Sequence, residues 1–248
     1  MKEASNYLRY LILGLGRSGT TAIHFALKGH PNVCALNDEV NVSFFSEGIS
    51  TFTQRDNNSL EKEKGSKCLF DAIAGIFSNE KTKAIGMKCV PSDLQATKTL
   101  TIALKKHFPE LKIILLIRKD LTAQYGSMIR AKTTGEWHSW RQPKHPSTSQ
   151  IKLNKRLFKN YIERSILKLN ELKTLSNSHD LLEVEYEKCL LAKNGPDFST
   201  IFNFLNLPNL EATWLNCNKV APPPKEYIRN YEKMKILFNE YRQSNFSK

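Results

Sequence analysis

The sequence predicts an α/β fold with a mainly parallel β-sheet. Apolar stretches short enough for strands alternate with longer segments whose apolar residues recur every three or four positions. The stretch 113–117, Ile-Ile-Leu-Leu-Ile, is continuous and rich in β-branched residues, as a central parallel strand is. A glycine-rich turn at 14–19 joins the first apolar stretch to the first helical segment. Strands that alternate with helices in this way form parallel sheets covered by helices.

The N-terminal part of the chain shows three expected strands with helices between them. The first helix is expected to end at Gly29-His30-Pro31, which stops helical periodicity. The polar segment 41–67 is expected to be an irregular surface excursion with at most a short helix. In chain order, the expected elements are strand 10–15, helix 20–28, strand 32–36, helix 68–77 and strand 83–90.

The C-terminal part continues the alternation. Ser92-Asp93 is expected to cap a helix that runs to His107. Apolar residues from Ile151 to Leu172 fall mostly at three- and four-residue steps, which predicts one long amphipathic helix. The remaining expected elements are strand 111–117, helix 121–132, loop 133–149, strand 181–186, helix 198–205 and, after Pro222-Pro223-Pro224, a helix near 232–241.

Length and composition predict one globular domain over residues 1–248, of which 40% are hydrophobic. The longest apolar run has five residues, whereas a membrane-spanning helix needs about 20, so no transmembrane segment is expected. The five cysteines are scattered without a Cys-x-x-Cys pair, and no metal-ligand cluster is visible, so no metal is expected. Together with the lack of a secretory signal pattern, this favours a cytoplasmic location.

An excess of basic residues indicates an anionic partner. The chain has 37 Lys and Arg against 24 Asp and Glu, a formal net charge of +13. Nucleic acid, a membrane surface and a phosphorylated small molecule are the candidate partners. Nucleic acid is disfavoured, because the basic residues are spread through the chain and form no continuous stripe interleaved with aromatic residues.

The turn at 14–21, Gly-Leu-Gly-Arg-Ser-Gly-Thr-Thr, carries the clearest chemical signal. Gly14 and Gly19 have the spacing of a phosphate-binding P-loop, but Thr20 stands where that loop carries its lysine. Glycines let backbone N–H groups turn toward an anion, and the N-terminus of the next helix adds a positive dipole end. Arg17 can supply a fixed cation. The expected anion ligands are Gly14, Gly16, Arg17, Ser18, Gly19, Thr20 and Thr21.

This loop resembles the 5′-phosphosulfate loop of the sulfotransferases, which use 3′-phosphoadenosine-5′-phosphosulfate (PAPS) as the sulfuryl donor. The resemblance implies a three-layer α/β/α, P-loop-kinase-like fold with PAPS as co-substrate. It also implies that residues 14–21 hold the 5′-phosphate and the sulfuryl group.

A second anion site is expected after strand 111–117. Arg118 ends that strand, where side chains face the crevice in which open α/β sheets bind ligands. Ser127 follows nine residues later, about two helical turns along the next helix, and its hydroxyl could join Arg118 on one phosphate. In the resembled family this pair holds the 3′-phosphate of PAPS. A spacing of eight residues, usual in cytosolic phenol and steroid sulfotransferases, would select Lys119 instead. The continuation to Thr134-Gly135-Glu136-Trp137 is similar to bacterial carbohydrate sulfotransferases.

Sulfuryl transfer to an alcohol requires a base for the hydroxyl proton. Related sulfotransferases have a His-Pro-x-Val segment followed by a glutamate that is the proposed base. His30-Pro31-Asn32-Val33 followed by Glu39 resembles this arrangement, with Asp38 as the neighbouring alternative. His138 and His145, in the expected loop 133–149, are further alternatives.

Two cations are expected to neutralise the transferring group. Arg17 lies in the phosphate loop, and Lys88 ends the stretch Ile85-Gly86-Met87-Lys88, which is similar to a strand of the bacterial branch. The C-terminal adenosine motif of the cytosolic enzymes is absent, and Lys225 and Arg229 are its candidate replacements.

The sequence therefore predicts a PAPS-dependent sulfotransferase that acts on a hydroxyl of a carbohydrate or small metabolite by in-line transfer with a carboxylate base. A P-loop kinase-like phosphotransferase is one alternative, which would need the missing lysine and a Mg²⁺-holding aspartate. A non-catalytic protein that binds anions or nucleic acid is the other. The sequence leaves the oligomeric state open.

Overall fold

A parallel sheet of five strands forms the centre of the protein in the computed structural model, which describes residues 7–46, 51–55, 59–63, 69–137, 150–210 and 222–246. The strand order is β2-β5-β1-β6-β7, and every neighbouring pair is parallel. These strands are β1 (Leu8–Gly14), β2 (Val33–Glu39), β5 (Ala84–Cys89), β6 (Lys112–Ile117) and β7 (Leu181–Glu185). The first strand of the chain is thus the middle strand of the sheet.

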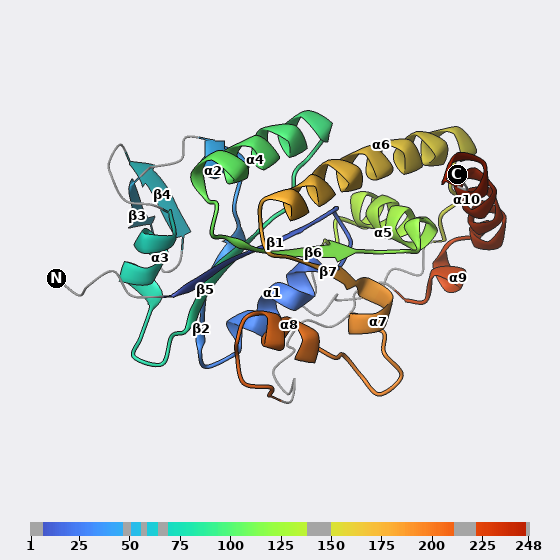
Figure 1. Ribbon diagram of the computed structural model, residues 1–248. Helices are drawn as coiled ribbons and strands as arrows, with labels where there is room; N and C mark the ends of the chain where they lie inside the picture. Colours follow the sequence, from blue (N-terminus) through green and yellow to red (C-terminus); the bar gives the residue numbers. More distant parts are fainter. Residues whose placement is uncertain are drawn as a thin grey trace.

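Helices cover both faces of the sheet (Figure 1). One face carries α1 (Thr20–Lys28), α7 (Tyr186–Leu190) and α8 (Ser199–Phe204). The other face carries α2 (Ser43–Ser46), α3 (Leu69–Phe77), α4 (Leu94–His107), α6 (Lys155–Lys173) and the 3₁₀ turn η2 (Thr174–Asn177). The expected three-layer α/β architecture with a mainly parallel sheet is therefore confirmed.

Alternating residues of β1 supply the two main cores. Leu11 and Leu13 are fully buried in the core beneath α4 and α6. Tyr10 and Ile12 are fully buried on the opposite face, in the core with α1 and α8. A strand whose side chains are buried on both faces has a continuous run of apolar residues in its sequence. This pattern is why the sequence predicted β1 and β6.

A third apolar cluster lies beyond the carboxyl end of β6. It joins α5 (Leu121–Thr134) and the first half of α6 to α9 (Pro224–Tyr227) and α10 (Tyr231–Phe246). The helix α6 spans two clusters, because Phe158 and Ile162 belong to this one and Leu172 to the core on the sheet. The C-terminal segment is thereby fixed against α5, close to the loop that ends β1.

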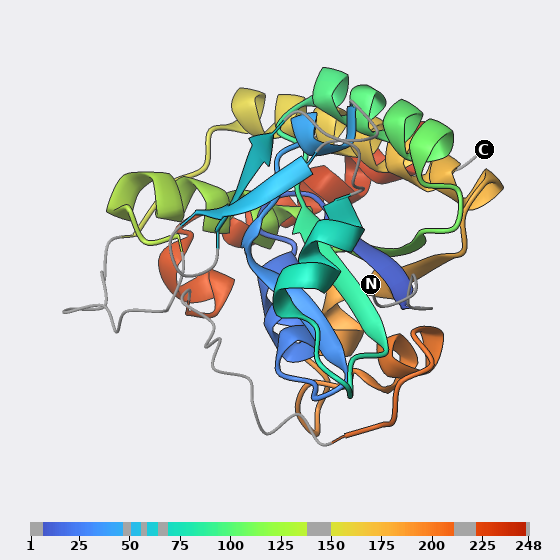
Figure 2. The same ribbon diagram turned by 90° about the vertical axis from the view of Figure 1, so that its left-hand side faces the viewer.

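Segment 41–67 is more regular than the sequence indicated. Besides the short α2, it contains an antiparallel hairpin of β3 (Thr51–Arg55) and β4 (Ser59–Glu63), which Figures 1 and 2 show at one end of the molecule beside α3. The expectation of an irregular excursion was wrong. Both strands are largely polar, so they lack the apolar signal that identifies strands of the main sheet.

The long amphipathic helix begins at Lys155, not at Ile151. Asn154 caps it by accepting a hydrogen bond from the Leu157 N–H at 3.1 Å. Ile151 instead forms a parallel β-bridge with Ile228, in which its N–H donates to the Tyr227 carbonyl at 2.7 Å. Ile151 therefore belongs to this bridge, and the expectation that it belongs to the helix was wrong.

None of the helices within the described ranges is both long and apolar enough to cross a bilayer.

The close approach of Tyr10 to Gly86 provides a test of the core. These residues are register partners in β1 and β5, and a Cβ atom at Gly86 would overlap the Tyr10 ring. Gly86→Ala should lower the free energy of unfolding by roughly 1–3 kcal/mol through overpacking. Urea denaturation measures this change.

Gly75→Ala is the matched control for the same change of side chain. Gly75 lies in α3 with no atom within 4 Å of the added Cβ, so the substitution should stabilise the helix by about 0.5–1 kcal/mol. Equal effects at the two positions would contradict the contact between Tyr10 and Gly86.

Candidate active site at the carboxyl end of the sheet

The loop between β1 and α1 places its backbone at the carboxyl end of the central strand. The chain turns sharply, with Arg17 at φ 65° and Gly19 at φ 96°, and the Ser18 N–H donates to the Leu15 carbonyl at 3.1 Å. Two features require glycine at position 19. Its positive φ favours glycine, and a Cβ atom there would lie 2.7 Å from side-chain atoms of Tyr186 and Leu190. The sequence thus fixes a tight turn directly before α1.

The N-terminus of α1 is open to an anion. Gly19 is its N-cap, so no side chain accepts from the first-turn N–H groups, and the first turn has no acidic residue. By contrast, Asp93, Asp120 and Asn154 cap the helices α4, α5 and α6 with their side chains. The Ser18 hydroxyl is also buried without a hydrogen-bond partner among the described residues. Unpaired donors at a helix N-terminus form a ready site for phosphate or sulfate.

Arg118 and Ser127 both contact Arg17 of this loop, one through the Arg17 carbonyl and the other through its side chain. The Arg118 guanidinium donates to the Arg17 carbonyl at 3.1 Å and stacks over the Tyr186 ring at 4.5 Å. Arg118 is 8% exposed. Lys119, the sequence alternative, is exposed and lines a hollow with Glu185 and Lys188 on the β7 side. The structure therefore places Arg118, rather than Lys119, next to the loop.

The Arg17 side chain points toward the second anion site, although its backbone belongs to the loop. Its Nε donates to the Ser127 hydroxyl at 3.1 Å, and its Nη1 donates to the Trp137 carbonyl at 2.5 Å. Burial lowers the pKa of Arg17, and the nearby Arg118 and Arg130 lower it further. Arg17 thus links the loop to α5, where Ser127 stands.

Arg130 is a third arginine in this region, buried like Arg118, and the sequence reasoning missed it. It is 3% exposed and forms an ion pair with Glu136 at 2.9 Å, while its Nε has no partner among the described residues. It follows Ser127 by three positions on α5, and residues three apart share a helix face. That spacing is the signal that could have identified it.

Tyr227 completes the cluster from the C-terminal segment. It is 3% exposed, and its hydroxyl has no hydrogen-bond partner in the described part of the chain. Burial raises the pKa of Tyr227, while the charges of Arg118, Arg130 and Arg17 lower it.

Lys225 and Arg229, the residues suggested by the sequence for this segment, have other partners. Lys225 pairs with Glu232 at 2.7 Å, and Arg229 Nε donates to Gln150 Oε1 at 3.2 Å. Within the same segment, Tyr227 is the residue whose side chain reaches the arginines.

The charges of this arginine cluster (Arg17, Arg118 and Arg130) are not balanced by the protein. Among the described residues, Glu136 is the one carboxylate that forms an ion pair with them. The Nε atoms of Arg118 and Arg130 and the Tyr227 hydroxyl are buried without hydrogen-bond partners in the part of the chain that the structure describes. Buried charges are costly unless they are paired. The arrangement fits a ligand with about two negative charges, such as a phosphate monoester.

Glu39 and Lys88 meet on the other side of the loop. They are register partners in β2 and β5, and Lys88 Nζ lies 3.3 Å from Glu39 Oε2. The same Nζ donates to the Thr21 hydroxyl at 3.0 Å, in the first turn of α1. The Lys88 side chain is 8% exposed, whereas that of Glu39 is 43% exposed. A buried cation thus reaches the open N-terminus of α1, with an accessible carboxylate beside it.

Gln124 supports the loop from α5, although the sequence reasoning did not select it. Its Nε2 donates a hydrogen bond to the Gly16 carbonyl at 2.8 Å.

Three alternative bases cannot be placed, because the Asp38 side chain, His138 and His145 lie outside the described residues. Within the described ranges, no three His, Cys, Asp or Glu side chains gather closely enough to hold a metal ion.

Comparison with known proteins gives a consistent result. "Nodulation protein H" of Rhizobium meliloti is 22% identical over 237 residues, which cover 92% of this chain and 90% of that protein. The sulfotransferase domain of the Synechococcus PCC 7002 olefin synthase superposes with a TM-score of 0.51 at 14% identity, over 94% of this chain and 96% of that one, and is similar in fold.

The family model described as "Sulfotransferase family" matches residues 10–211. This range contains the loop at the end of β1, the whole arginine cluster and the pair of Glu39 and Lys88. The match covers most of the chain, and the chain therefore belongs to the sulfotransferase family.

Proposed function

We propose that this sulfotransferase uses PAPS as the donor and transfers its sulfuryl group to a hydroxyl of a carbohydrate or small-metabolite acceptor. The observation that carries the proposal is the pairing of two anion sites. The open N-terminus of α1 and the arginine cluster adjoin each other, and Arg17 belongs to both. PAPS carries a 5′-phosphosulfate and a 3′-phosphate on one ribose, so one molecule can occupy both sites.

The arginine cluster suits the 3′-phosphate. A terminal phosphate monoester carries about −1.5 to −2 charges at neutral pH, which matches three arginines offset by one carboxylate. Arg118 and Ser127 are its predicted ligands. Arg17, Arg130 and the Tyr227 hydroxyl are additional donors, because each lies in the same cluster. The ligand would then satisfy polar atoms that are otherwise buried without partners.

The loop suits the 5′-phosphosulfate. Backbone N–H groups from Gly14 to Thr21 and the dipole of α1 favour an anion at this point. Gly16 offers open space, since no atom lies within 4 Å of where its Cβ would be. The hydroxyls of Ser18, Thr20 and Thr21 are the side-chain donors of this site.

The transfer step assigns separate roles to Glu39 and Lys88. The acceptor oxygen attacks the sulfur in line, the bond from sulfur to the bridging phosphate oxygen breaks, and Glu39 takes the acceptor proton. Its exposed carboxylate is reachable by an acceptor. Lys88, which contacts Thr21 in the first turn of α1, neutralises the charge that develops on the bridging oxygen.

The cellular setting that we propose is the cytoplasm. Cys34, Cys89 and Cys189 are buried free thiols, as is usual in a reducing compartment.

Ligand-dependent thermal stability tests the choice of donor. The product nucleotide, 3′-phosphoadenosine-5′-phosphate, should raise the melting temperature, whereas ATP with Mg²⁺ should not. At 100 times its dissociation constant, the nucleotide should add about 2.7 kcal/mol to the free energy of unfolding. Stabilisation by ATP–Mg²⁺ alone would favour the kinase-like alternative.

The 3′-phosphate assignment predicts a nucleotide-specific loss. Arg118→Ala should weaken binding of 3′-phosphoadenosine-5′-phosphate about 10- to 150-fold, because a charge-assisted contact of roughly 1.5–3 kcal/mol is lost. Binding of 5′-AMP should hardly change. Isothermal titration calorimetry with both nucleotides measures the difference.

Lys119→Ala is the control for Arg118→Ala, because Lys119 is the adjacent residue and faces the β7 side. It should leave both affinities unchanged. If Arg118→Ala weakens both nucleotides equally, or if Lys119→Ala shows the selective loss, the assignment is wrong.

The role of Glu39 as base predicts a loss of turnover without a loss of donor binding. Glu39→Gln keeps the shape of the side chain and removes the proton acceptor, so the rate of transfer should fall about 10²- to 10⁴-fold. Affinity for 3′-phosphoadenosine-5′-phosphate should stay within a few-fold. Asp38→Asn is the neighbouring control and should be milder. An active Glu39→Gln enzyme beside an inactive Asp38→Asn enzyme would move the base by one residue.

A further inference from the structure

Three helices on one side of the molecule carry most of its net positive charge. The helices α4, α6 and α10 adjoin one another, because α6 packs against both of the others. Together they contain twelve Lys and Arg but four Asp and Glu, a net of eight positive charges out of the +13 of the chain. We call the outer surface of these three helices the basic face.

Three of the four acidic residues on these helices have partners within the protein. Glu171 accepts a hydrogen bond from the Thr101 hydroxyl on α4 at 2.6 Å. Glu163 bonds the Tyr241 hydroxyl on α10 and raises its pKa. Glu232 pairs with Lys225 at 2.7 Å. Hydrogen bonds from neutral hydroxyls leave the negative charges of Glu171 and Glu163 in place, and the net of eight positive charges already includes all four carboxylates.

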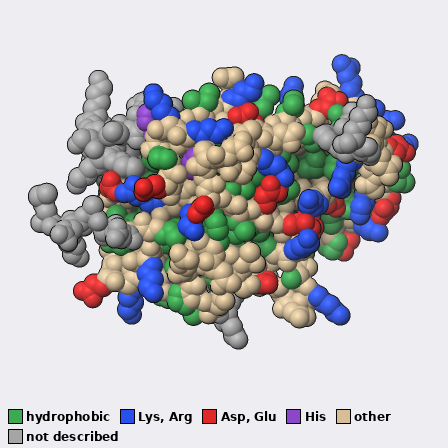
Figure 3. Space-filling view, in the orientation of Figure 1, with side chains coloured by type: hydrophobic (Ala, Val, Ile, Leu, Met, Phe, Trp, Pro, Cys, Tyr) green, Lys and Arg blue, Asp and Glu red, His purple; other side chains and the backbone are tan. Residues whose placement is uncertain are grey.

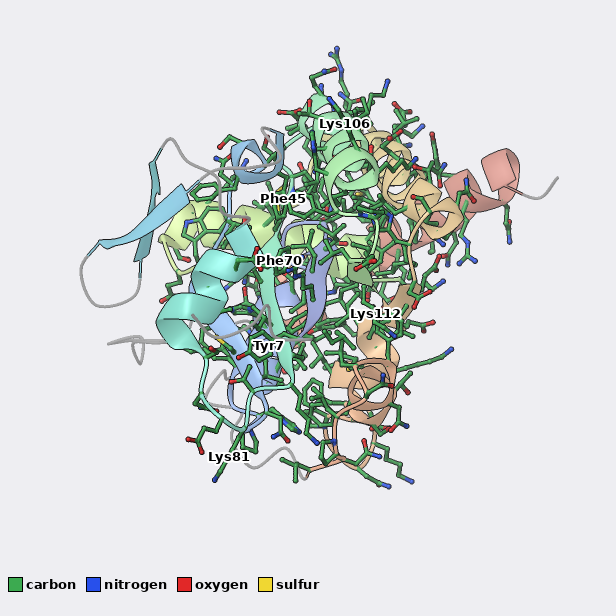
Figure 4. All side chains as sticks on the ribbon, turned by 60° about the vertical axis from the view of Figure 1, so that its left-hand side comes forward. Tyr7, Phe45, Phe70, Lys81, Lys106 and Lys112 are labelled. Atoms are coloured by element: carbon green, nitrogen blue, oxygen red, sulfur yellow. The ribbon has the colours of Figure 1, made fainter. Side chains whose placement is uncertain are left out.

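Several cations of the basic face point into solvent. Lys98, Lys106, Arg156 and Arg164 are exposed. Figure 4 shows Lys106 at the outer end of α4, on the opposite side of the molecule from Lys81. The space-filling view shows Lys and Arg side chains along the edge formed by α4 and α6, with hydrophobic side chains among them (Figure 3).

The same helices expose the least buried large apolar side chains of the described residues. Ile102 on α4 is 65% exposed, Ile236 on α10 is 57% exposed, and Leu157 and Leu167 on α6 are 56% and 52% exposed. Single exposed apolar residues are common, but here the four most exposed ones all lie on the helices that carry the excess of cations. Aliphatic side chains among Lys and Arg are typical of surfaces that bind the interface of anionic lipid membranes.

We propose that the basic face docks the protein peripherally onto anionic lipid membranes. The cations meet lipid phosphates, and the four aliphatic side chains enter the boundary between headgroups and acyl chains. A nucleic acid would use the cations but would gain nothing from exposed aliphatic side chains, since its single strands stack on aromatic residues. The proposal does not depend on the donor or on the acceptor, because none of its residues lies in the active site.

Sedimentation with vesicles tests this proposal. The full chain should bind vesicles of phosphatidylcholine with about 30% phosphatidylglycerol and should not bind pure phosphatidylcholine, and raising NaCl from about 0.1 to 0.5 M should weaken binding. Lys98→Gln/Lys106→Gln should lower the partition coefficient about 25-fold, or about fivefold for each charge. Ile102→Ser/Leu167→Ser should lower it about tenfold at unchanged charge.

The control variant is Lys81→Gln/Lys83→Gln, which removes two exposed lysines elsewhere. It should bind vesicles as the parent protein does. Absence of binding to anionic vesicles would overturn the proposal, as would an equal loss in the control or no loss in Ile102→Ser/Leu167→Ser. Binding of duplex DNA through Lys98 and Lys106, without vesicle binding, would assign the face to nucleic acid instead.

Discussion

Three arginines gather at the candidate active site, two of them buried, and Glu136 is the one carboxylate among the described residues that pairs with them; this is the constraint on which the site depends. Unpaired buried charge destabilises a fold, so the surrounding structure has to hold these side chains in place. The Trp137 carbonyl and the Ser127 hydroxyl fix Arg17, Glu136 fixes Arg130, and the Tyr186 ring with the Arg17 carbonyl fixes Arg118. These contacts hold the arginine cluster in place for the phosphate that we propose as its ligand.

The sheet brings the two halves of the site together. Because β1 is the middle strand, its loop lies between the end of β6, which delivers Arg118, and the end of β5, which delivers Lys88. The parallel register opposes Glu39 to Lys88 across β2 and β5. Residues far apart in the chain therefore meet at one edge, as the rule for ligand sites in open parallel sheets requires.

Sequence alone located much of this arrangement, and the failures have identifiable causes. The loop, the strand ending in Arg118 and the helix bearing Ser127 follow from local patterns of glycine and apolar residues. The direction of the Arg17 side chain does not, because it depends on a left-handed backbone and on Trp137, 120 residues away. Tyr227 precedes Ile228, whose bridge to Ile151 is a long-range contact that local sequence patterns do not show. The hairpin β3–β4 has polar strands that give no periodic apolar signal.

In the proposed mechanism, the two groups of cations contact different parts of the donor, and the proposal therefore separates donor binding from catalysis. The 3′-phosphate keeps its charge throughout the transfer, so the arginine cluster stabilises the bound donor and the transition state equally. Such uniform binding strengthens donor affinity without accelerating the chemical step. Charge on the bridging oxygen and on the acceptor oxygen changes as the bonds to sulfur change. In the mechanism that we propose, Lys88, which contacts Thr21 in the first turn of α1, and its partner Glu39 respond to that change, so the proposal assigns the rate enhancement to this pair rather than to the arginines.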